Sequence, residues 1–107
     1  TMHERKKLMC EKADAFIAMP GGFGTIEEIF EMITWGQLKL HNKPCAFLNI
    51  NGYYDKLIEF LNITEREGFI NQGFINMAIF ENEPASVLKK IFEYEPPKID
   101  KAKLALK

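Results

Sequence analysis

The chain has 107 residues, of which 47% are hydrophobic and 27% are charged, and its formal net charge is -1. This length and composition indicate one globular domain at most and exclude a disordered or fibrous protein. The near-neutral charge provides no basic field for a nucleic-acid backbone, so we expect no nucleic-acid partner. No stretch approaches the roughly 20 apolar residues of a membrane helix, and the start TMHERKK lacks an apolar signal segment. We therefore expect a cytoplasmic protein without a membrane partner.

Helical and extended patterns alternate along the chain. Helical periodicity predicts helices over about 3–13, 26–38, 53–67 and 84–94. Short apolar runs predict strands over 15–19, 45–50 and 77–80. This alternation favours an α/β fold with a parallel sheet, and runs that are apolar on both faces indicate helices on each side of the sheet. Because no strand precedes the first helix and three strands make a thin sheet, we expect part of a larger domain or a sheet that depends on a partner chain.

The C-terminal residues and the cysteines add two expectations. Pro96 and Pro97 end the last helix, which separates residues 1–95 from a lysine-rich tail, 96–107, that is either helical or frayed. Cys10 and Cys45 lie in apolar surroundings and belong to no CxxC or Cys/His pattern. We expect reduced thiols and no metal site.

A glycine-rich loop connects the first predicted strand to the next helix. Gly21, Gly22 and Gly24 precede a helix predicted to start near Thr25, which gathers backbone N–H groups and a positive helix end around one concavity. Glycine allows positive φ and close approach of a phosphate. The loop is neither a Walker A sequence nor GxGxxG. A tight turn that needs glycine for geometry alone is the alternative, and the position after a parallel strand favours ligand binding.

Two adjacent glutamates open this helix. Thr25 and Glu28 have the spacing of a capping box, with Thr25 as the N-cap. The helical period places Glu27 on the solvated side and Glu28 beside Met32 and Trp35, a second apolar stripe that is a candidate subunit interface. Glu28 is therefore either a helix cap or a carboxylate that faces the sugar of a bound nucleotide.

The first predicted helix carries two basic side chains next to an apolar stripe. Met2, Met9 and Ala13 line the stripe, and Arg5 and Lys6 flank it. One interpretation is that both side chains extend from this edge into solvent. The other is that an arginine near a buried face requires a carboxylate or phosphate partner.

Two motifs in this order resemble a known family. Residues 2–6, MHERK, match MHxRK, and residues 20–28, PGGFGTIEE, match PGGxGTxxE. The chain thus resembles the LOG (Lonely Guy) family of cytokinin riboside 5'-monophosphate phosphoribohydrolases, many of which carry the label possible lysine decarboxylase. The resemblance covers nearly all of the chain before Pro96. It implies a Rossmann-like fold, a homodimer with active sites near the subunit interface, and hydrolysis of a nucleoside 5'-monophosphate to free base and ribose 5-phosphate, and we expect no cofactor.

The resemblance also implies residue roles by motif position. Arg5 and Glu28 would be the catalytic pair. The substrate-binding residues would be Met2, Lys6, Gly21, Gly22, Gly24 and Thr25. A carboxylate can stabilise positive charge on the ribose, attack it as a nucleophile or activate water, and Arg5 could orient Glu28 or neutralise phosphate.

Full-length family members begin with a strand and another glycine-rich loop that nothing in this chain matches. The chain is therefore expected to be the C-terminal portion of a longer protein or to lack part of the pocket. Two other functions compete with hydrolysis. One is a non-catalytic nucleotide-binding module. The other is decarboxylation, which requires pyridoxal phosphate on a lysine, and no lysine lies in a distinctive cofactor setting.

Overall fold

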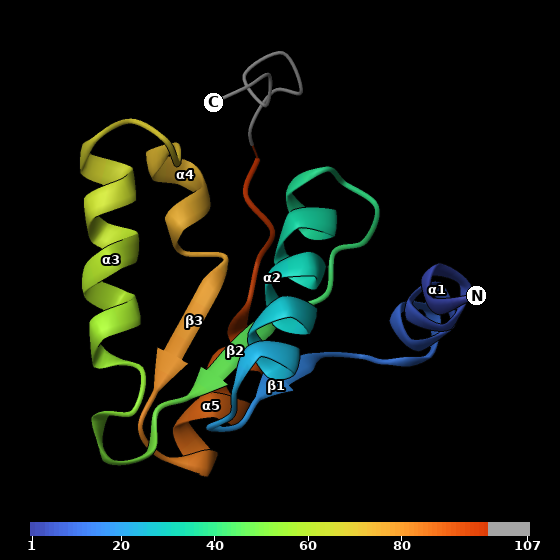
Figure 1. Cartoon of the computed structure of the whole chain (residues 1–107), viewed down its shortest axis with the longest axis horizontal. Coiled ribbons are helices and arrows are strands. Elements are labelled where there is room, and N and C mark those ends of the chain that lie inside the picture. Colours follow the sequence, from blue (N-terminus) through green and yellow to red (C-terminus); the bar gives the residue numbers. More distant parts are fainter. Residues whose placement is uncertain (99–107) are drawn as a thin grey trace.

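The structure, a computed structural model, describes residues 1–98, apart from the side chain of Gln72. Figure 1 shows the arrangement of its elements, which in chain order are α1 (Met2–Lys12), β1 (Phe16–Ala18), α2 (Phe23–Gln37), β2 (Cys45–Leu48), a 3-10 turn (Ile50–Gly52), α3 (Asp55–Arg66), α4 (Gln72–Ile75), β3 (Ala78–Glu81) and α5 (Pro84–Glu93). The strands form a parallel sheet in the order β1-β2-β3. The α/β fold with a parallel sheet is thus confirmed. The prediction for the tail beyond residue 98 lies outside the described residues.

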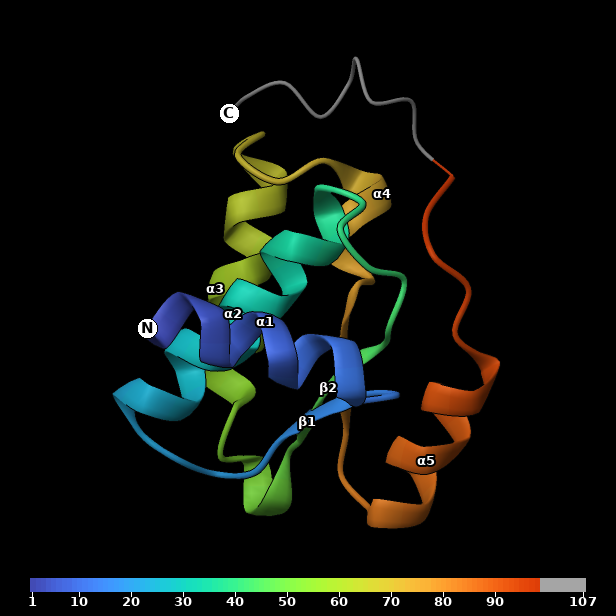
Figure 2. The same cartoon turned by 90° about the vertical axis from the view of Figure 1, so that its right-hand side faces the viewer.

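The central strand β2 is buried on both faces, as the sequence predicts. Ala46 and Phe47 are both 0% exposed although they point to opposite sides of the sheet. On one side Phe47 stacks on Phe80 with ring centroids 4.4 Å apart, and it contacts Tyr54 edge-on at 5.1 Å. On the other side Ala46 belongs to a cluster with Val87 of α5. Figure 2 shows α5 on the face of the sheet opposite α2 and α3.

The first strand differs from this prediction on one face. Phe16 and Ala18 are buried beneath α2, whereas Ile17 between them is 44% exposed. The reason is that α5 packs mainly against β2 and β3 and leaves Ile17 on this face of β1 exposed. The expectation that helices cover the strands on both faces is therefore wrong for β1, which presents an apolar residue to solvent.

Element boundaries depart from the predictions in three places. Helix α2 begins at Phe23, before the predicted start, because the glycine loop closes directly onto an N-cap at Gly22. The predicted helix over 53–67 is preceded by a turn with positive φ at Asn51 and Gly52, and α3 starts at Asp55. The four-residue helix α4 was not predicted, because it is too short to show helical periodicity.

Helix α5 agrees closely with its prediction. Pro84 occupies the first turn, where its fixed φ is compatible with a helix and its missing N–H has no helical partner to lose. Within residues 1–98, no helix combines the length and apolar character that crossing a membrane requires.

The stacked aromatic cluster predicts a large and localised effect of truncation. Replacing Phe47 by Ala removes a fully buried ring and leaves a cavity between Phe30, Tyr54 and Phe80, so the free energy of unfolding is expected to fall by about 3–5 kcal/mol. Phe92, which is 86% exposed, provides the control, and its change to Ala is expected to alter that free energy by less than about 0.5 kcal/mol. Urea denaturation of the full-length protein measures both, and equal effects would contradict the assignment of the core.

Candidate active site

The glycine loop delivers unpaired backbone donors to the start of α2. Gly22 is the N-cap with φ of -106°, and no side chain caps the helix. In the part of the chain that the structure describes, the N–H groups of Phe23, Gly24 and Thr25 have no hydrogen-bond acceptor. Such donors, together with the positive end of the helix macrodipole, favour an anion at this position.

The predicted capping box at Thr25 and Glu28 is wrong. Helix α2 starts at Phe23, so Thr25 already lies within the first turn and cannot act as its N-cap. A capping box is present instead at the start of α1, where the Thr1 hydroxyl accepts from the Glu4 N–H and the Glu4 carboxylate accepts from the Thr1 amino group. Capping of α2 therefore does not explain the presence of Glu28.

The three loop glycines differ in the space around them, and none of them has a positive φ. Positive φ among glycines occurs at Gly52 and Gly68 in the described residues, so the loop does not use the positive φ that glycine allows. A Cβ atom at Gly21 would lie 2.8 Å from Thr25 Cβ, a distance too short for two carbon atoms. A Cβ at Gly22 or Gly24 would meet no atom within 4 Å, so the backbone there is open to an approaching ligand.

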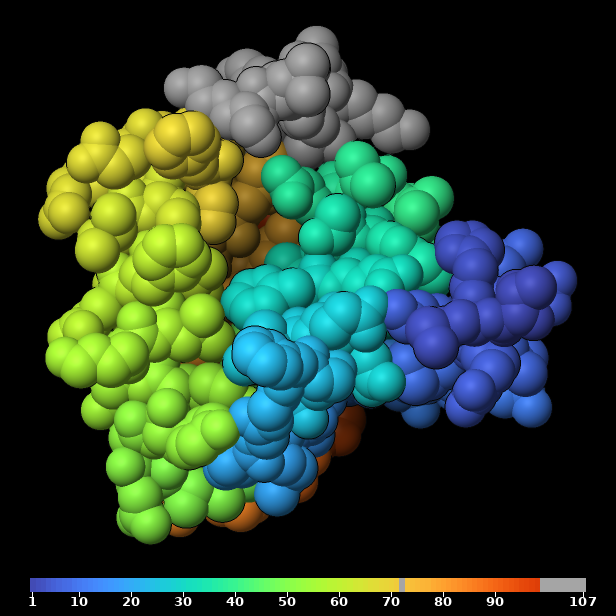
Figure 3. All heavy atoms as spheres, viewed as in Figure 1, coloured from blue at the N-terminus to red at the C-terminus, as the bar shows by residue number. Residues whose placement is uncertain are grey.

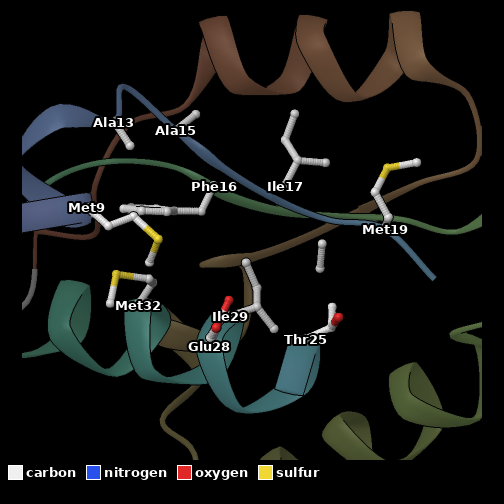
Figure 4. A pocket seen from close by; sticks show the side chains of 11 residues that line it. Met9, Ala13, Ala15, Phe16, Ile17, Met19, Thr25, Glu28, Ile29 and Met32 are labelled. Atoms are coloured by element: carbon white, nitrogen blue, oxygen red, sulfur yellow. The ribbon is translucent and has the colours of Figure 1, made fainter. Parts of the chain in front are cut away.

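A cavity of about 420 Å³ runs along β1 between α1 and α2. Its lining residues are Met9, Ala13, Ala15, Phe16, Ile17, Ala18, Met19, Thr25, Glu28, Ile29 and Met32. Its walls are largely apolar, and Figure 4 shows Thr25 and Glu28 extending from α2 toward β1.

A second cavity, of about 460 Å³, lies between α1 and the first turns of α2. Its lining residues are Met2, Arg5, Lys6, Met9, Gly24, Glu27 and Glu28. Five of the positions that the family motifs single out therefore line one space, namely Met2, Arg5, Lys6, Gly24 and Glu28. Glu28 and Met9 line both cavities, so this carboxylate lies where the apolar groove meets the basic residues of α1.

Arg5 and Glu28 face the same cavity without neutralising each other. Both residues are exposed, and no ion pair within 4.0 Å joins them in residues 1–98. Gly21, Gly22 and Thr25 lie at the adjoining loop and do not line this cavity. The arrangement presents a free carboxylate and a free guanidinium to one ligand-sized space beside a helix end with unpaired backbone donors.

Lys6 has a different environment from its neighbour Arg5. Its ammonium group binds the Glu27 carboxylate and lies 2.6 Å from Glu31 Oε2. The side chain of Lys6 is 14% exposed and that of Glu27 54% exposed, so Glu27 is accessible but is not the unpaired, solvated residue that we expected. Hydrogen bonds to Glu27 and then Glu31 raise the pKa of Lys6, and the hydrogen bond from Lys6 lowers the pKa of Glu27.

Other contacts that hold α1 in place lie at its C-terminal end. Cys10 is the one buried residue of α1. Of the predicted stripe, Ala13 packs against the core, whereas Met2 and Met9 are exposed. Lys43 donates to the Cys10 carbonyl and, at 3.1 Å, to the Glu11 carbonyl at the C-terminal end. Figure 3 shows α1 at one side of the molecule next to α2, and Figure 2 shows it in front of α2.

The flank of α2 that we expected at a subunit interface is covered within this chain. Met32 is 1% exposed and belongs to the same core cluster as Cys10. The Trp35 ring meets the His3 ring of α1 edge-on, with centroids 5.8 Å apart. Helix α1 therefore packs against the second apolar stripe of α2. The prediction of a subunit interface at this stripe is wrong.

The two thiols are free and buried, in agreement with the prediction of reduced cysteines. Burial raises the pKa of Cys45 to about 12, and it also raises the pKa of Cys10. Neither thiol is therefore a nucleophile near neutral pH. Residues 1–98 contain no group of three or more His, Cys, Asp or Glu side chains placed to hold a metal ion.

Sequence reasoning missed two residues at the glycine loop. The Tyr53 hydroxyl donates to the Gly21 carbonyl at 2.6 Å, and the Tyr54 hydroxyl donates to the Met19 carbonyl at 2.5 Å. Both lie in the segment NGYYD, which follows β2 as the glycine loop follows β1. Adjacent parallel strands bring the segments after their carboxyl ends together, and that rule could have placed the two tyrosines beside the loop.

A comparison with protein families identifies the group to which these motifs belong. A family model described as "Possible lysine decarboxylase" matches residues 1–91. The chain belongs to this family.

Curated relatives of this family member carry a more specific name. It is 43% identical over 106 residues to probable cytokinin riboside 5'-monophosphate phosphoribohydrolase LOGL5 of Oryza sativa subsp. japonica, covering 99% of this chain and 43% of the relative. It is 45% identical over 95 residues to cytokinin riboside 5'-monophosphate phosphoribohydrolase LOG4 of Arabidopsis thaliana, covering 89% and 44%. The resemblance to the LOG family is thereby confirmed. The chain spans about two fifths of the length of these relatives.

The ion pairs of Lys6 with Glu27 and Glu31 predict that the charge of Lys6 holds α1 against α2. Replacing Lys6 by Met keeps the apolar stem but removes both ion pairs, so faster amide hydrogen exchange is expected within Met2–Lys12 of the full-length protein. Lys56→Met, which removes an exposed ion pair with Glu59 on α3, is the control and is expected to leave α1 unchanged. Unchanged exchange in α1 of the Lys6 variant would contradict this role.

The same contacts define a pH window. The lowered pKa of Glu27 contributes stability above its ordinary value of 4.5, and this contribution is lost as the pH falls through the lowered pKa. The raised pKa of Lys6 contributes below its ordinary value of 10.5, and this contribution is lost as the pH rises through the raised pKa. Protection of the α1 amides from hydrogen exchange is therefore expected to be full between pH 4.5 and pH 10.5 and to decrease outside this range. The pH dependence is expected to be weaker at high salt concentration.

Substitution of Gly21 is expected to affect folding, and substitution of Gly24 is expected to affect phosphate binding. Gly21→Ala places a methyl group against Thr25, so a loss of about 1–3 kcal/mol in unfolding free energy is expected. Gly24→Ala has room in the free protein, so stability is expected to be unchanged or slightly higher, but the methyl group enters the cavity beside the helix end. Thermal unfolding and phosphate titration of the full-length protein separate the two effects. Undiminished phosphate binding by Gly24→Ala would argue against an anion site here.

Proposed function

We propose that the protein hydrolyses the N-glycosidic bond of a nucleoside 5'-monophosphate, of the cytokinin riboside or AMP type, to free base and ribose 5-phosphate. The observation that carries this proposal is the cavity shared by Arg5, Glu28 and Gly24, which places a free carboxylate and a guanidinium beside the start of α2. The names of the relatives support the same activity, because they describe phosphoribohydrolases of a cytokinin riboside 5'-monophosphate.

The 5'-phosphate would bind at the glycine loop. The N–H groups of Phe23, Gly24 and Thr25 are available donors, and Gly22 and Gly24 leave the backbone open. A phosphate held there would place the ribose within reach of the first turns of α2, because the 5'-carbon is one bond from the phosphate ester oxygen. Thr25 and Gly21 would support this site through their mutual contact.

Glu28 would act on the ribose. Cleavage of an N-glycosidic bond builds positive charge at the anomeric carbon, which a carboxylate stabilises electrostatically or meets as a nucleophile. As a general base, the same carboxylate would take a proton from the attacking water. Each of these roles requires an unpaired carboxylate, and in the described residues Glu28 forms no ion pair, unlike Glu27 and Glu31.

Three residues of α1 would complete the wall of the site. Arg5 would orient Glu28 or neutralise phosphate through charged hydrogen bonds. Met2 is 66% exposed at the cavity and would offer apolar contact to the substrate. Lys6 would lie near the substrate while its ion pairs hold α1 against α2.

Pyridoxal phosphate, which the family label suggests, does not fit this site. Schiff-base chemistry needs a lysine that loses its proton readily, usually through desolvation or a neighbouring cation. Lys6, the lysine at the cavity, is paired with two carboxylates that raise its pKa, which is the opposite environment. Lys43 is engaged with the carbonyl end of α1.

The proposal extends to the whole protein. Residues 1–95 would form a portion of a Rossmann-like nucleotide-binding domain, followed by the tail at 96–107. The active protein would be a cytoplasmic homodimer with active sites near the subunit interface. Because the chain spans 43% of the rice relative, residues outside it would contribute the rest of the nucleotide pocket.

Removal of the Glu28 charge predicts a loss of turnover without a loss of folding. Glu28→Gln in the full-length protein is expected to lower the rate of base release from AMP or an N6-substituted adenosine 5'-monophosphate by about 100-fold or more, because an amide neither donates electrons effectively nor carries charge. Glu59→Gln on the exposed face of α3 is the control and is expected to retain the parental rate. Chromatography of the released base measures the rate.

Two outcomes would contradict the proposal. Parental activity of the Glu28→Gln protein would remove Glu28 from the chemistry. Intact nucleotide after long incubation of the wild-type protein with several bases would remove the hydrolase, and tight nucleotide binding under those conditions would instead favour a non-catalytic binding module.

A further inference from the structure

Two tyrosines after β2 hold the carbonyl groups of the glycine loop. The Tyr53 hydroxyl donates to the Gly21 carbonyl at 2.6 Å, and the Tyr54 hydroxyl donates to the Met19 carbonyl at 2.5 Å. In Figures 1 and 2 the segment after β2 lies next to the segment that joins β1 to α2. Two side chains from one turn therefore fix two carbonyl groups of the proposed phosphate loop.

The planarity of the peptide bond gives the Tyr53 contact a consequence for anion binding. In a trans peptide the C=O of one residue and the N–H of the next point in opposite directions, and this chain has no cis peptide in its described part. A hydroxyl that holds the Gly21 carbonyl on one side of the loop thus directs the Gly22 N–H to the other side. It also keeps a carbonyl oxygen, which repels phosphate, from turning toward the anion.

The turn that carries the tyrosines is itself fixed by a buried polar residue. Asn49, which is 4% exposed, accepts from the Tyr54 N–H at 2.6 Å and donates to Asp55 Oδ1 at 2.9 Å. Its own N–H donates to the Glu81 carbonyl, which ties the turn to the end of β3. Positive φ at Asn51 and Gly52 reverses the chain between these anchors.

The tyrosines differ in how much of their position the core dictates. Tyr54 is 2% exposed and packs edge-on against Phe47, so its ring belongs to the core. Burial raises the pKa of its hydroxyl, and neighbouring Tyr53 raises it further, so the group remains a donor across the ordinary pH range. Tyr53 is 55% exposed and contacts the Tyr54 ring at 4.9 Å. An exposed ring needs no such hydrogen bond for folding, which makes Tyr53 the more informative residue.

We propose that Tyr53 and Tyr54 are positioning residues of the phosphate site. The Tyr53 hydroxyl holds the Gly21 carbonyl and so directs the Gly22 N–H toward the 5'-phosphate. The Met19 carbonyl precedes Pro20, which has no N–H, so the Tyr54 hydroxyl acts by keeping this carbonyl turned away from the anion. The inference rests on the proposed function for the identity of the anion. It adds residues that lie outside both family motifs and line neither cavity beside Glu28. Their role is binding of the phosphate group, and the cleavage step itself does not require them.

The test uses calorimetric titration of the full-length protein carrying Glu28→Gln, so that AMP stays intact. Adding Tyr53→Phe keeps the ring and removes the hydroxyl, and it is expected to weaken the binding of AMP and of inorganic phosphate by about 3- to 10-fold. Tyr94→Phe, the matched control at the end of α5, is expected to change neither affinity. In the protein with Glu28 intact, Tyr53→Phe is expected to raise the KM for AMP and leave kcat nearly unchanged.

A merely structural role would give a different result. It would lower the melting temperature of the Tyr53→Phe protein and reduce kcat and apparent affinity together, which would overturn the inference, as would unchanged affinity for AMP and phosphate. Tyr54→Phe is expected to weaken phosphate binding in the same direction. Base release by the wild-type protein tests the hydrolase separately, so dependence of AMP binding on Tyr53 in a protein that releases no base would refute the proposed function alone.

Discussion

Burial of β2 on both faces is the constraint on which the rest of the structure depends. Its four residues are all at most 6% exposed, so the strand accepts only a position between the layer of α2 and α3 and the layer of α5. That position fixes the register of β1 and β3, since Phe16, Cys45 and Ala78 lie side by side across the sheet. Because all three strands are parallel, the loops that leave their carboxyl ends emerge at one edge.

The candidate site combines rigid and adjustable parts at that edge. Glu28 belongs to α2, which directly follows the glycine loop and is held by Ile29 and Met32 in the core. Arg5 belongs to α1, which has one buried residue and is held largely by polar contacts of Lys6 and Lys43. Packing thus places Glu28, whereas electrostatic contacts place Arg5. These contacts weaken at extreme pH and at high salt concentration.

The fold could be predicted from the sequence because its strands are apolar and its helices periodic. The order of strands and helices and the double burial of β2 followed from these patterns. The exposed face of β1 did not, because Ile17 looks as apolar as Phe16 and its exposure depends on which strands α5 covers. The site residues came from two motifs, and five of the eight line one cavity between α1 and α2.

Other features of the site depended on long-range contacts that periodicity does not contain. Lys6 and Glu27 are 21 positions apart, and Tyr53 and Gly21 are 32 positions apart. The capping box failed for a different reason. Thr25 and Glu28 have the right spacing, but the helix begins three residues earlier, with Gly22 as its N-cap, and local spacing alone does not reveal where a helix starts.

The connection between α1 and α2 passes through β1, a strand of three residues with alternating buried and exposed side chains. Successive side chains of a strand point to opposite faces, so inserting or deleting one residue there would exchange those faces. Phe16 and Ala18 would then leave the core, or the chain would shift by one residue and carry α1 along the sheet relative to α2. The spacing between the two motifs in the sequence is therefore constrained by the length of a strand that contains neither of them.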